Sequence, residues 1–276
     1  MPLEQITITD QDIVYAEETL LPPGERFDEE RRVYIRSLAT LDLQAVPGSG
    51  KTTALLAKLL VIERSLPLDD GVGVLVLSHT NIAVDEIKGK IGRLCPKLLA
   101  YPNFVGTIQS FVDQFLAIPF GHSYLGIRFA TIDTERYQEL LWQKYQAICW
   151  APEFDKPARL FWRRHHDRCL KEAGNDESEA KRLYNERVEA DVRDLFYDMA
   201  DDKIKKFSTR ETIVSDPQNR KYLGLKTIIW EVLKKGVLSY EYAYRMAEAL
   251  LRKAPTVTRL LRKRFRFVFV DEMQDM

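Results

Sequence analysis

The sequence has few of the features that mark secreted or membrane proteins. It contains three cysteines, Cys95, Cys149 and Cys169, whose odd number and wide spacing argue against a disulfide framework. No apolar run reaches the roughly 20 residues that a membrane-spanning helix needs, and the N-terminal residues do not form a charged-then-apolar signal peptide. We therefore expect a cytoplasmic protein with reduced thiols.

The sequence also lacks a net charge, because 41 basic residues balance 41 acidic residues. This balance argues against a uniformly basic nucleic-acid-binding protein, but it leaves room for a local basic segment. One such segment, free of acidic residues, runs from 252 to 266 and holds Arg252, Lys253, Arg259, Arg262, Lys263, Arg264 and Arg266. A nucleic-acid track and a solvated helix end explain it equally well.

The clearest motif is the segment AVPGSGKTT at residues 45–53, between an apolar run (Leu41 to Val46) and a helical pattern (Thr52 to Leu60). Its glycines allow backbone N–H groups to surround a polyphosphate, Lys51 can reach the β- and γ-phosphates, and the Thr52 hydroxyl can bind Mg²⁺. The alternative is a glycine-rich turn that binds nothing, which the flanking strand and helix disfavour. The predicted nucleotide-binding residues are Ala45, Pro47, Gly48, Ser49, Gly50, Lys51, Thr52 and Thr53.

A second motif follows the β-prone run Phe265 to Val270, where the chain reads DEMQD at residues 271–275. An acidic pair after a strand is what a Walker B site needs: Asp271 would hold Mg²⁺, and Glu272 would orient and deprotonate the attacking water. The alternative is an acidic segment that is merely solvated. The phosphate-binding motif favours the metal site.

The pattern between these motifs predicts the fold class. Strands are expected over Gly71 to Leu77 and Phe104 to Thr107, each followed by a helical pattern, as in an α/β protein with a parallel sheet. From 119 to 263 helical spacing dominates, as in Thr134 to Trp150, Glu179 to Met199 and Tyr240 to Leu251. We therefore expect a first domain part at 1–118, a mostly helical insertion at 119–263, and a return to the first domain at 264–276.

In order and character, these motifs resemble those of the UvrD/Rep-type superfamily 1 DNA helicases. Residues 45–53 resemble motif I, VLVLSHTNIAVDEI at 74–87 resembles motif Ia, and GTIQSF at 106–111 resembles the G-T-[IF]-H-S-F segment. VDEMQD at 270–275 resembles the V-D-E-x-Q-D form of motif II. The resemblance covers essentially the whole chain, and it is to the N-terminal half of such an enzyme.

The resemblance implies a RecA-like P-loop NTPase domain (1A) with a 1B-like helical insertion, and ATP and Mg²⁺ as cofactors. It implies that Lys51 and Thr52 bind phosphate and Mg²⁺, that Asp271 binds Mg²⁺, that Glu272 is the general base, and that Gln274 senses the γ-phosphate. It places four residues near a single-stranded DNA track: Thr80, Asn81, Thr107 and Ser110. Helix capping by Thr80 or Asn81, and a first-turn hydroxyl at Ser110, are structural roles that can coexist with DNA contact.

Three residues depart from the family pattern. His79 stands where phenylalanine is common and Gln109 where histidine is common, which bears on base stacking and coupling. Arg31 stands where an adenine-reading glutamine is expected, which bears on nucleotide specificity.

The resemblance predicts the ATP-binding N-terminal portion of an ATP-dependent DNA helicase that unwinds 3′ to 5′ when intact. A second RecA-like domain supplies transition-state arginines in this family, so we expect the chain alone to hydrolyse ATP slowly or not at all. The expected partners are single-stranded DNA and a separate polypeptide carrying the other half. The alternatives are a non-catalytic DNA- or partner-binding fragment and an unrelated P-loop NTPase. DNA repair, plasmid, phage and anti-phage roles all stay open.

Overall fold

A computed structural model describes residues 6–41, 50–68, 71–148 and 167–271. The chain divides into two compact units. The first unit comprises residues 1–111 and 256–276, and the second comprises residues 112–255. The expected domain boundaries at 118 and 263 stay a prediction.

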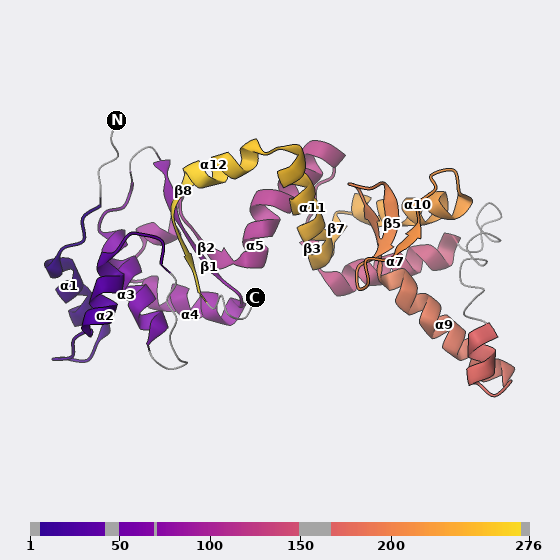
Figure 1. Cartoon of the computed structure of the whole chain (residues 1–276), viewed down its shortest axis with the longest axis horizontal. Coiled ribbons are helices and arrows are strands. Elements are labelled where there is room, and N and C mark those ends of the chain that lie inside the picture. Colours follow the sequence, from indigo (N-terminus) through magenta and orange to yellow (C-terminus); the bar gives the residue numbers. More distant parts are fainter. Residues whose placement is uncertain (1–5, 42–49, 69–70, 149–166, 272–276) are drawn as a thin grey trace. The chain divides into compact units, whose positions relative to one another are not determined.

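The first unit is built on a parallel sheet (Figure 1). In the described part of the chain its strand order is β2-β1-β8, with β2 at Phe104–Thr107, β1 at Gly73–Ser78 and β8 at Phe265–Val270. Every residue of β1 is buried, as an unbroken apolar run in the centre of a parallel sheet predicts. The three strands confirm the parallel α/β sheet expected from the sequence.

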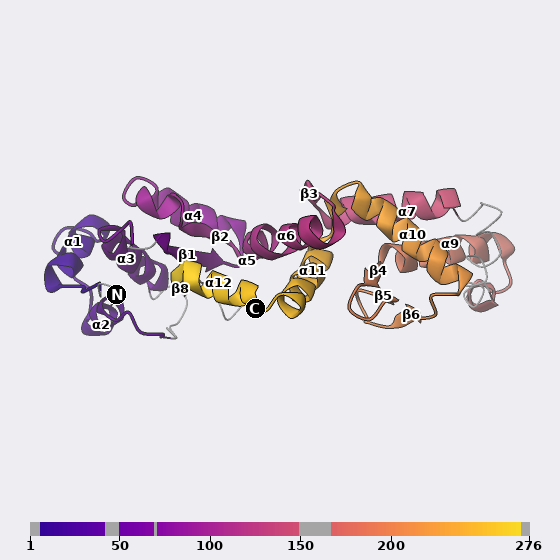
Figure 2. The same cartoon turned by 90° about the horizontal axis from the view of Figure 1, so that it is seen from above.

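Six α-helices of the described chain begin in this unit, and Figure 2 shows α1, α2 and α3 grouped together. The longest, α3, buries ten consecutive residues from Ala54 to Glu63. Its apolar side chains form one core with Ile13 of α1, Val74 and Val76 of β1, and Ile87 of α4. The helices are α1 (Asp10–Leu20), α2 (Glu29–Arg36), α3 (Lys51–Glu63), α4 (Asn81–Ile91), α5 (Ile108–Val112) and α12 (Thr256–Arg264), with a 3₁₀ turn η2 (Lys97–Leu99).

A buried carboxylate holds α2 in place. Glu17 of α1 is 1% exposed, and it accepts hydrogen bonds from the Phe27 backbone N–H at 3.0 Å and from Arg32 Nη2 at 2.8 Å. A buried charge is tolerated when it is paired and hydrogen-bonded, so these contacts tie α2 and the segment before it to α1.

A second buried carboxylate sets the direction of α3 across the sheet. Glu63, at the last turn of α3, accepts hydrogen bonds from the backbone N–H groups of Lys97 at 2.9 Å and Leu98 at 2.8 Å, just before β2 begins. Asn103 Oδ1 in turn accepts from the Val74 N–H at the start of β1 at 2.8 Å. The C-terminus of α3 therefore lies at the amino ends of the strands, and its N-terminus faces the carboxyl edge.

The second unit is mostly helical, with two small sheets. The expected helices at Thr134 and Tyr240 are confirmed as α7 and α11, whereas the expected helix over Glu179 to Met199 ends at Arg193. Its helices with both ends in the described residues are η3 (Asp113–Ala117), α6 (Ile118–Phe120), η4 (Gly121–Leu125), α7 (Thr134–Ile148), α9 (Glu177–Arg193), α10 (Arg220–Lys234) and α11 (Tyr240–Lys253). Its strands are β3 (Thr131–Ile132) with β7 (Val237–Leu238), and β4 (Leu195–Asp198), β5 (Lys203–Lys206) and β6 (Thr212–Val214).

Stacked aromatic rings and hydrogen bonds to one aspartate connect the elements of the second unit. Phe196 of β4 stacks on Phe207 with ring centroids 4.4 Å apart. Asp202 accepts hydrogen bonds from the Tyr197 hydroxyl at 2.6 Å and from Lys226 Nζ at 3.0 Å, and it also accepts one from the Tyr222 hydroxyl. These bonds lower the pKa of Asp202 to about 2, and the bond from Tyr197 has the largest effect.

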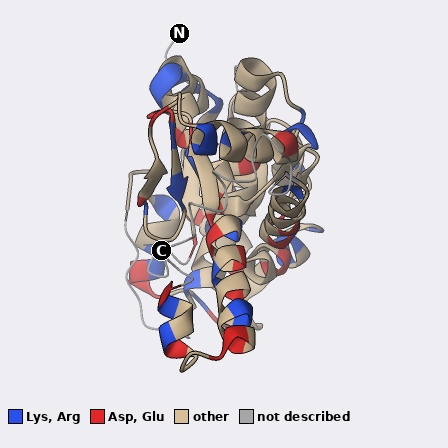
Figure 3. Cartoon of the chain, turned by 90° about the vertical axis from the view of Figure 1, so that its right-hand side faces the viewer, with Lys and Arg blue, Asp and Glu red and all other residues tan. Residues whose placement is uncertain are grey.

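Charged side chains of both signs lie along several of the helices, as Figure 3 shows. On α9, Arg182 pairs with Glu179 and with Glu186, one helical turn away on either side, as expected for a solvated helix. None of the helices in the described ranges is long and apolar enough to cross a membrane.

Candidate functional site

The described part of the phosphate-binding motif begins at Gly50, which precedes the first residue of α3. Gly50 has φ 83°, a left-handed conformation that glycine adopts at little cost. Lys51, Thr52 and Thr53 form the first turn of α3 and are half-buried. The first-turn N–H groups of a helix have no partner within the helix, which makes such an end a favourable place for a phosphate. The predicted residues Ala45, Pro47, Gly48 and Ser49 lie outside the described residues.

Helix α2 presents two side chains to this region. Arg31 lies over Gly50, since a Cβ placed on Gly50 would be 3.5 Å from its Nη2 atom. The Asp28 carboxylate caps α2 by accepting from the Arg31 N–H at 2.8 Å, and it also pairs with the Arg31 guanidinium. Tyr34 lies one turn further along α2. Burial, together with the negative charge of Asp271, raises the pKa of Tyr34 to about 12.

Three polar residues stand at the carboxyl edge of the sheet, one at the end of each strand. Ser78 of β1 pairs with Thr107 of β2. On the other side Leu77 pairs with Val270 of β8, and the Asp271 N–H donates to the Leu77 carbonyl at 2.8 Å, which places Asp271 opposite Ser78. We call Thr107, Ser78 and Asp271 the polar row.

The polar row lies on the face of the sheet that packs against α3. Val76 of β1 and Phe269 of β8 are in register with each other and belong to the core that contains α3. Ser78 and Asp271 come two residues later on their strands and so project from the same face. Lys58 of α3 also lies 5.8 Å from the centroid of the Phe269 ring. From Lys58 the N-terminal half of α3 extends toward the carboxyl edge, which puts Lys51 at the same edge of the sheet as Asp271.

The residues predicted to lie near DNA have clear local roles. Thr80 is the N-cap of α4, and its hydroxyl accepts from the Ala83 N–H at 3.2 Å, while the next residue, Asn81, is exposed. Thr107 Oγ1 accepts from the Ser110 N–H at 3.0 Å and donates to Ser110 Oγ at 3.1 Å. The capping role weighed for Thr80 and the first-turn role of the Ser110 hydroxyl are both observed, and DNA contact by these residues stays a prediction.

Sequence reasoning missed three residues near this site: Tyr34, Lys58 and Ser78. Lys58 is 3% exposed, and its ammonium donates to the Tyr34 carbonyl at 2.9 Å and the Ser37 carbonyl at 2.5 Å. Nothing in the sequence distinguishes Lys58 from a surface lysine except its place within an apolar helix. The predicted Glu272 and Gln274 lie outside the described residues.

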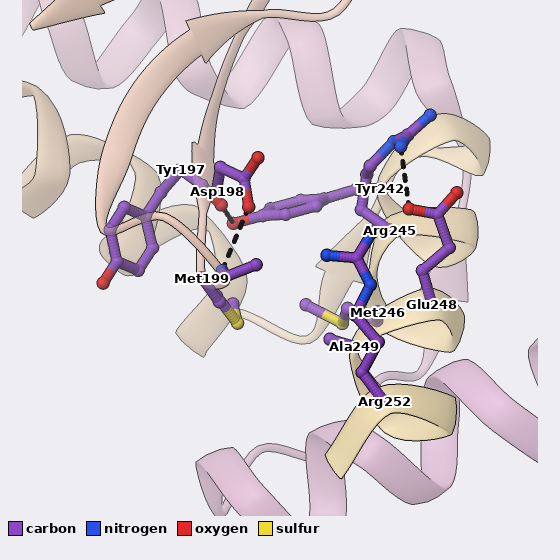
Figure 4. Close-up of a pocket in the computed structure, with 10 residues that line it drawn as sticks. Tyr197, Asp198, Met199, Tyr242, Arg245, Met246, Glu248, Ala249 and Arg252 are labelled. Atoms are coloured by element: carbon purple, nitrogen blue, oxygen red, sulfur yellow. Dashed lines mark hydrogen bonds and ion pairs between the residues drawn. The ribbon is translucent and has the colours of Figure 1, made fainter. Parts of the chain in front are cut away.

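A pocket in the second unit, between the end of β4 and α11, has a different character (Figure 4). Three of its charged groups pair with neighbours: Arg245 Nη1 donates to Glu248 at 2.8 Å, and Asp198 accepts from Lys205 Nζ at 2.8 Å. Two methionines, Met199 and Met246, contribute apolar lining. Arg252 also lines the pocket, and the buried Arg245 Nε atom has no hydrogen-bond partner in the described part of the chain.

Comparison with known proteins agrees with the motifs and the sheet. No curated protein matches the chain. A family described as the UvrD/REP helicase N-terminal domain matches residues 28–276, a span that includes the phosphate-binding motif, β1, β2, the second unit and β8. The match begins at Asp28, the residue that caps α2. The chain therefore belongs to the UvrD/REP helicase N-terminal domain family.

Proposed function

We propose that this chain is the ATP-binding N-terminal portion of an ATP-dependent DNA helicase, with Mg·ATP bound at the carboxyl edge of a RecA-like sheet. One observation carries the proposal. Helix α3 begins, after a left-handed Gly50, at the same edge where β8 ends in Asp271. The carboxyl edge is where α/β sheets bind ligands. At this edge the helix end can bind the phosphates of Mg·ATP, and the carboxylate can bind its metal ion.

The residues present fit magnesium. Mg²⁺ prefers hard oxygen ligands, and the Asp271 carboxylate and the Thr52 hydroxyl are of that kind. The buried Ser78 hydroxyl, beside Asp271, has no hydrogen-bond partner among the described residues. When bound, the ion would neutralise charge on the β- and γ-phosphates.

The remaining roles follow the family. Lys51 would hold the β- and γ-phosphates. Glu272 would orient the attacking water and take its proton, and Gln274 would respond to the γ-phosphate. Arg31 also lies over Gly50, where its guanidinium pairs with Asp28.

We propose that single-stranded DNA passes along the loops after β1 and β2. Thr80 and Asn81 are exposed there at the start of α4, so their polar groups are accessible to a sugar–phosphate backbone. Thr107 is 8% exposed and its hydroxyl bonds to Ser110, so we assign it to shaping the start of α5. In the intact helicase, ATP hydrolysis would drive translocation and unwinding, with 3′-to-5′ polarity.

We propose that residues 1–276 alone bind Mg·ATP and hydrolyse it slowly. In this family ATP lies between two RecA-like domains, and an arginine from the second domain stabilises the transferring phosphoryl group. Such an arginine is worth roughly 10³–10⁵ in rate. A polypeptide carrying the later helicase motifs would therefore be the partner that restores turnover.

The test measures both binding and turnover. A fluorescent ATP analogue is titrated into the wild-type chain and Lys51→Ala, and steady-state ATPase activity is measured with and without single-stranded DNA. We expect Lys51-dependent nucleotide binding with little turnover. DNA-stimulated turnover that Lys51→Ala abolishes would keep the ATPase assignment but refute the need for a second domain. Equal binding by wild type and variant would refute the nucleotide site, and a phosphorylated small-molecule product would indicate a kinase.

A further inference from the structure

The polar row contains one hydroxyl whose hydrogen bonds are not made within the described fold. Ser78 is 1% exposed, and no described residue bonds to its Oγ atom. Its neighbour Thr107 is also buried, but its hydroxyl bonds to the N–H and the hydroxyl of Ser110. Buried polar groups in folded proteins almost always have a partner, so Ser78 needs an explanation of its own.

The position of Ser78 supplies that explanation. The backbone ladder places it directly opposite Asp271, on the face of the sheet that packs against α3. Residues two positions earlier on the same strands, Val76 and Phe269, are part of the apolar core. A serine among such residues loses hydration without gaining packing, and a valine there would continue the pattern of β1. The hydroxyl lies where the core ends and the proposed metal site begins.

We propose that Ser78 is a positioning residue for the magnesium site, and that its hydroxyl hydrogen-bonds to the Asp271 carboxylate or to a water held by the metal once Mg·nucleotide binds. The proposal rests on the proposed function. A metal-binding carboxylate is usually held by a hydrogen bond from a neighbouring group, and loss of such a bond typically weakens metal binding 10- to 100-fold. Ser78 lies opposite Asp271 in the ladder, where its hydroxyl can provide such a bond.

The test uses Ser78→Ala, which removes only the hydroxyl oxygen, and Ser78→Thr, which retains a hydroxyl. Binding of the fluorescent ATP analogue is titrated with Mg²⁺ and, separately, measured in EDTA. We expect Ser78→Ala to raise the Mg²⁺ concentration for half-maximal tight binding about 10- to 100-fold. Nucleotide affinity in EDTA and thermal stability should not fall, because the oxygen makes no bond in the described fold. Ser78→Thr should recover the Mg²⁺ response at least in part.

A matched control is available in the second unit. Ser239 is also 1% exposed, but its hydroxyl accepts from the Tyr242 N–H at 3.1 Å as the N-cap of α11. Ser239→Ala should lower thermal stability and leave the Mg²⁺ response unchanged, the reverse of Ser78→Ala. The inference would be overturned if Ser78→Ala needed a Mg²⁺ concentration for half-maximal tight binding within twofold of that of the wild type. In that case the proposed function would still stand, provided that nucleotide binding depended on Lys51. Loss of Lys51 dependence in the wild type would overturn both.

Discussion

The buried Lys58 gives a prediction whose size and sign follow from the structure. Its ammonium lies inside the first unit, bonded to two carbonyls at the end of α2 and 4.3 Å from the centroid of the Tyr34 ring. Burial disfavours the charged form and lowers the pKa of Lys58 to about 8. In the unfolded chain the same group has a pKa of about 10.4. Between these two values the unfolded chain binds more protons than the folded one, so stability rises with pH.

The magnitude follows from that difference. A shift of about 2.4 pKa units corresponds to about 3 kcal/mol, of which about 1 kcal/mol is recovered between pH 7 and pH 9. Replacing Lys58 with methionine removes this cost, but it also removes two hydrogen bonds from a charged donor, each worth about 1.5–3 kcal/mol. We therefore expect Lys58→Met to be nearly neutral or up to about 3 kcal/mol destabilising at pH 7. The difference in the free energy of unfolding between the wild type and Lys58→Met should be about 1 kcal/mol larger at pH 9 than at pH 7.

The assay must report on the first unit. All four tryptophans, at 142, 150, 162 and 230, lie in the second unit, so tryptophan fluorescence does not monitor α3 directly. Amide hydrogen exchange of α3, corrected for the intrinsic exchange rate at each pH, monitors this helix directly. Lys90→Met is the matched control, because Lys90 is 48% exposed on α4 and pairs only with Glu86 among the contacts described. The reasoning would be refuted if the difference in the free energy of unfolding between the wild type and Lys58→Met did not change with pH, or if it became smaller toward pH 9.

Three further predictions concern other parts of the fold. Gly50→Ala should cost about 1–2 kcal/mol, because alanine is strained at a left-handed φ, and should weaken nucleotide binding in the fluorescence titration. Glu63→Gln should cost about 1–3 kcal/mol by leaving a backbone N–H before β2 unpaired, seen as faster hydrogen exchange over residues 97–107. Asp202, with its pKa lowered to about 2, should contribute stability above about pH 4. That contribution should be lost as the pH falls toward 2, and Asp202→Asn should abolish this dependence in acid titrations followed by tryptophan fluorescence, which reports on the second unit.

The elements that the sequence predicted well are those marked by a continuous β-prone run or by a local capping residue. The strands of the first sheet are apolar runs bounded by turns, and β1 and β2 lie within two residues of their expected bounds. The N-cap of α4 was also predictable from the sequence, since Thr80 directly precedes the first helical residue. Local chemistry decides these features, so a single sequence is enough to find them.

The elements that were missed depend on distant partners. Helix α1 was not expected because its buried face includes Glu17, which is tolerated only through its contacts with Arg32 and the Phe27 N–H. Strand β5 reads Lys-Ile-Lys-Lys and resembles a solvated segment. It forms a strand because Lys205 pairs with Asp198 on β4 and with Asp201. The expected helix over 179–199 ended early because Phe196 and Tyr197 belong to the aromatic core of the second unit.

The candidate site shows the same division. The motifs point to Lys51 and Asp271 as candidates because phosphate and magnesium binding require particular residue types in a particular local order. They could not identify Ser78 in its proposed role, since a serine at the end of a buried strand has no distinguishing neighbour in the sequence. Its significance arises only when three strands align and bring Asp271 beside it. In this chain short motifs predict the ligand class, whereas the group that we propose orients a metal-binding residue is found only from the register of the sheet.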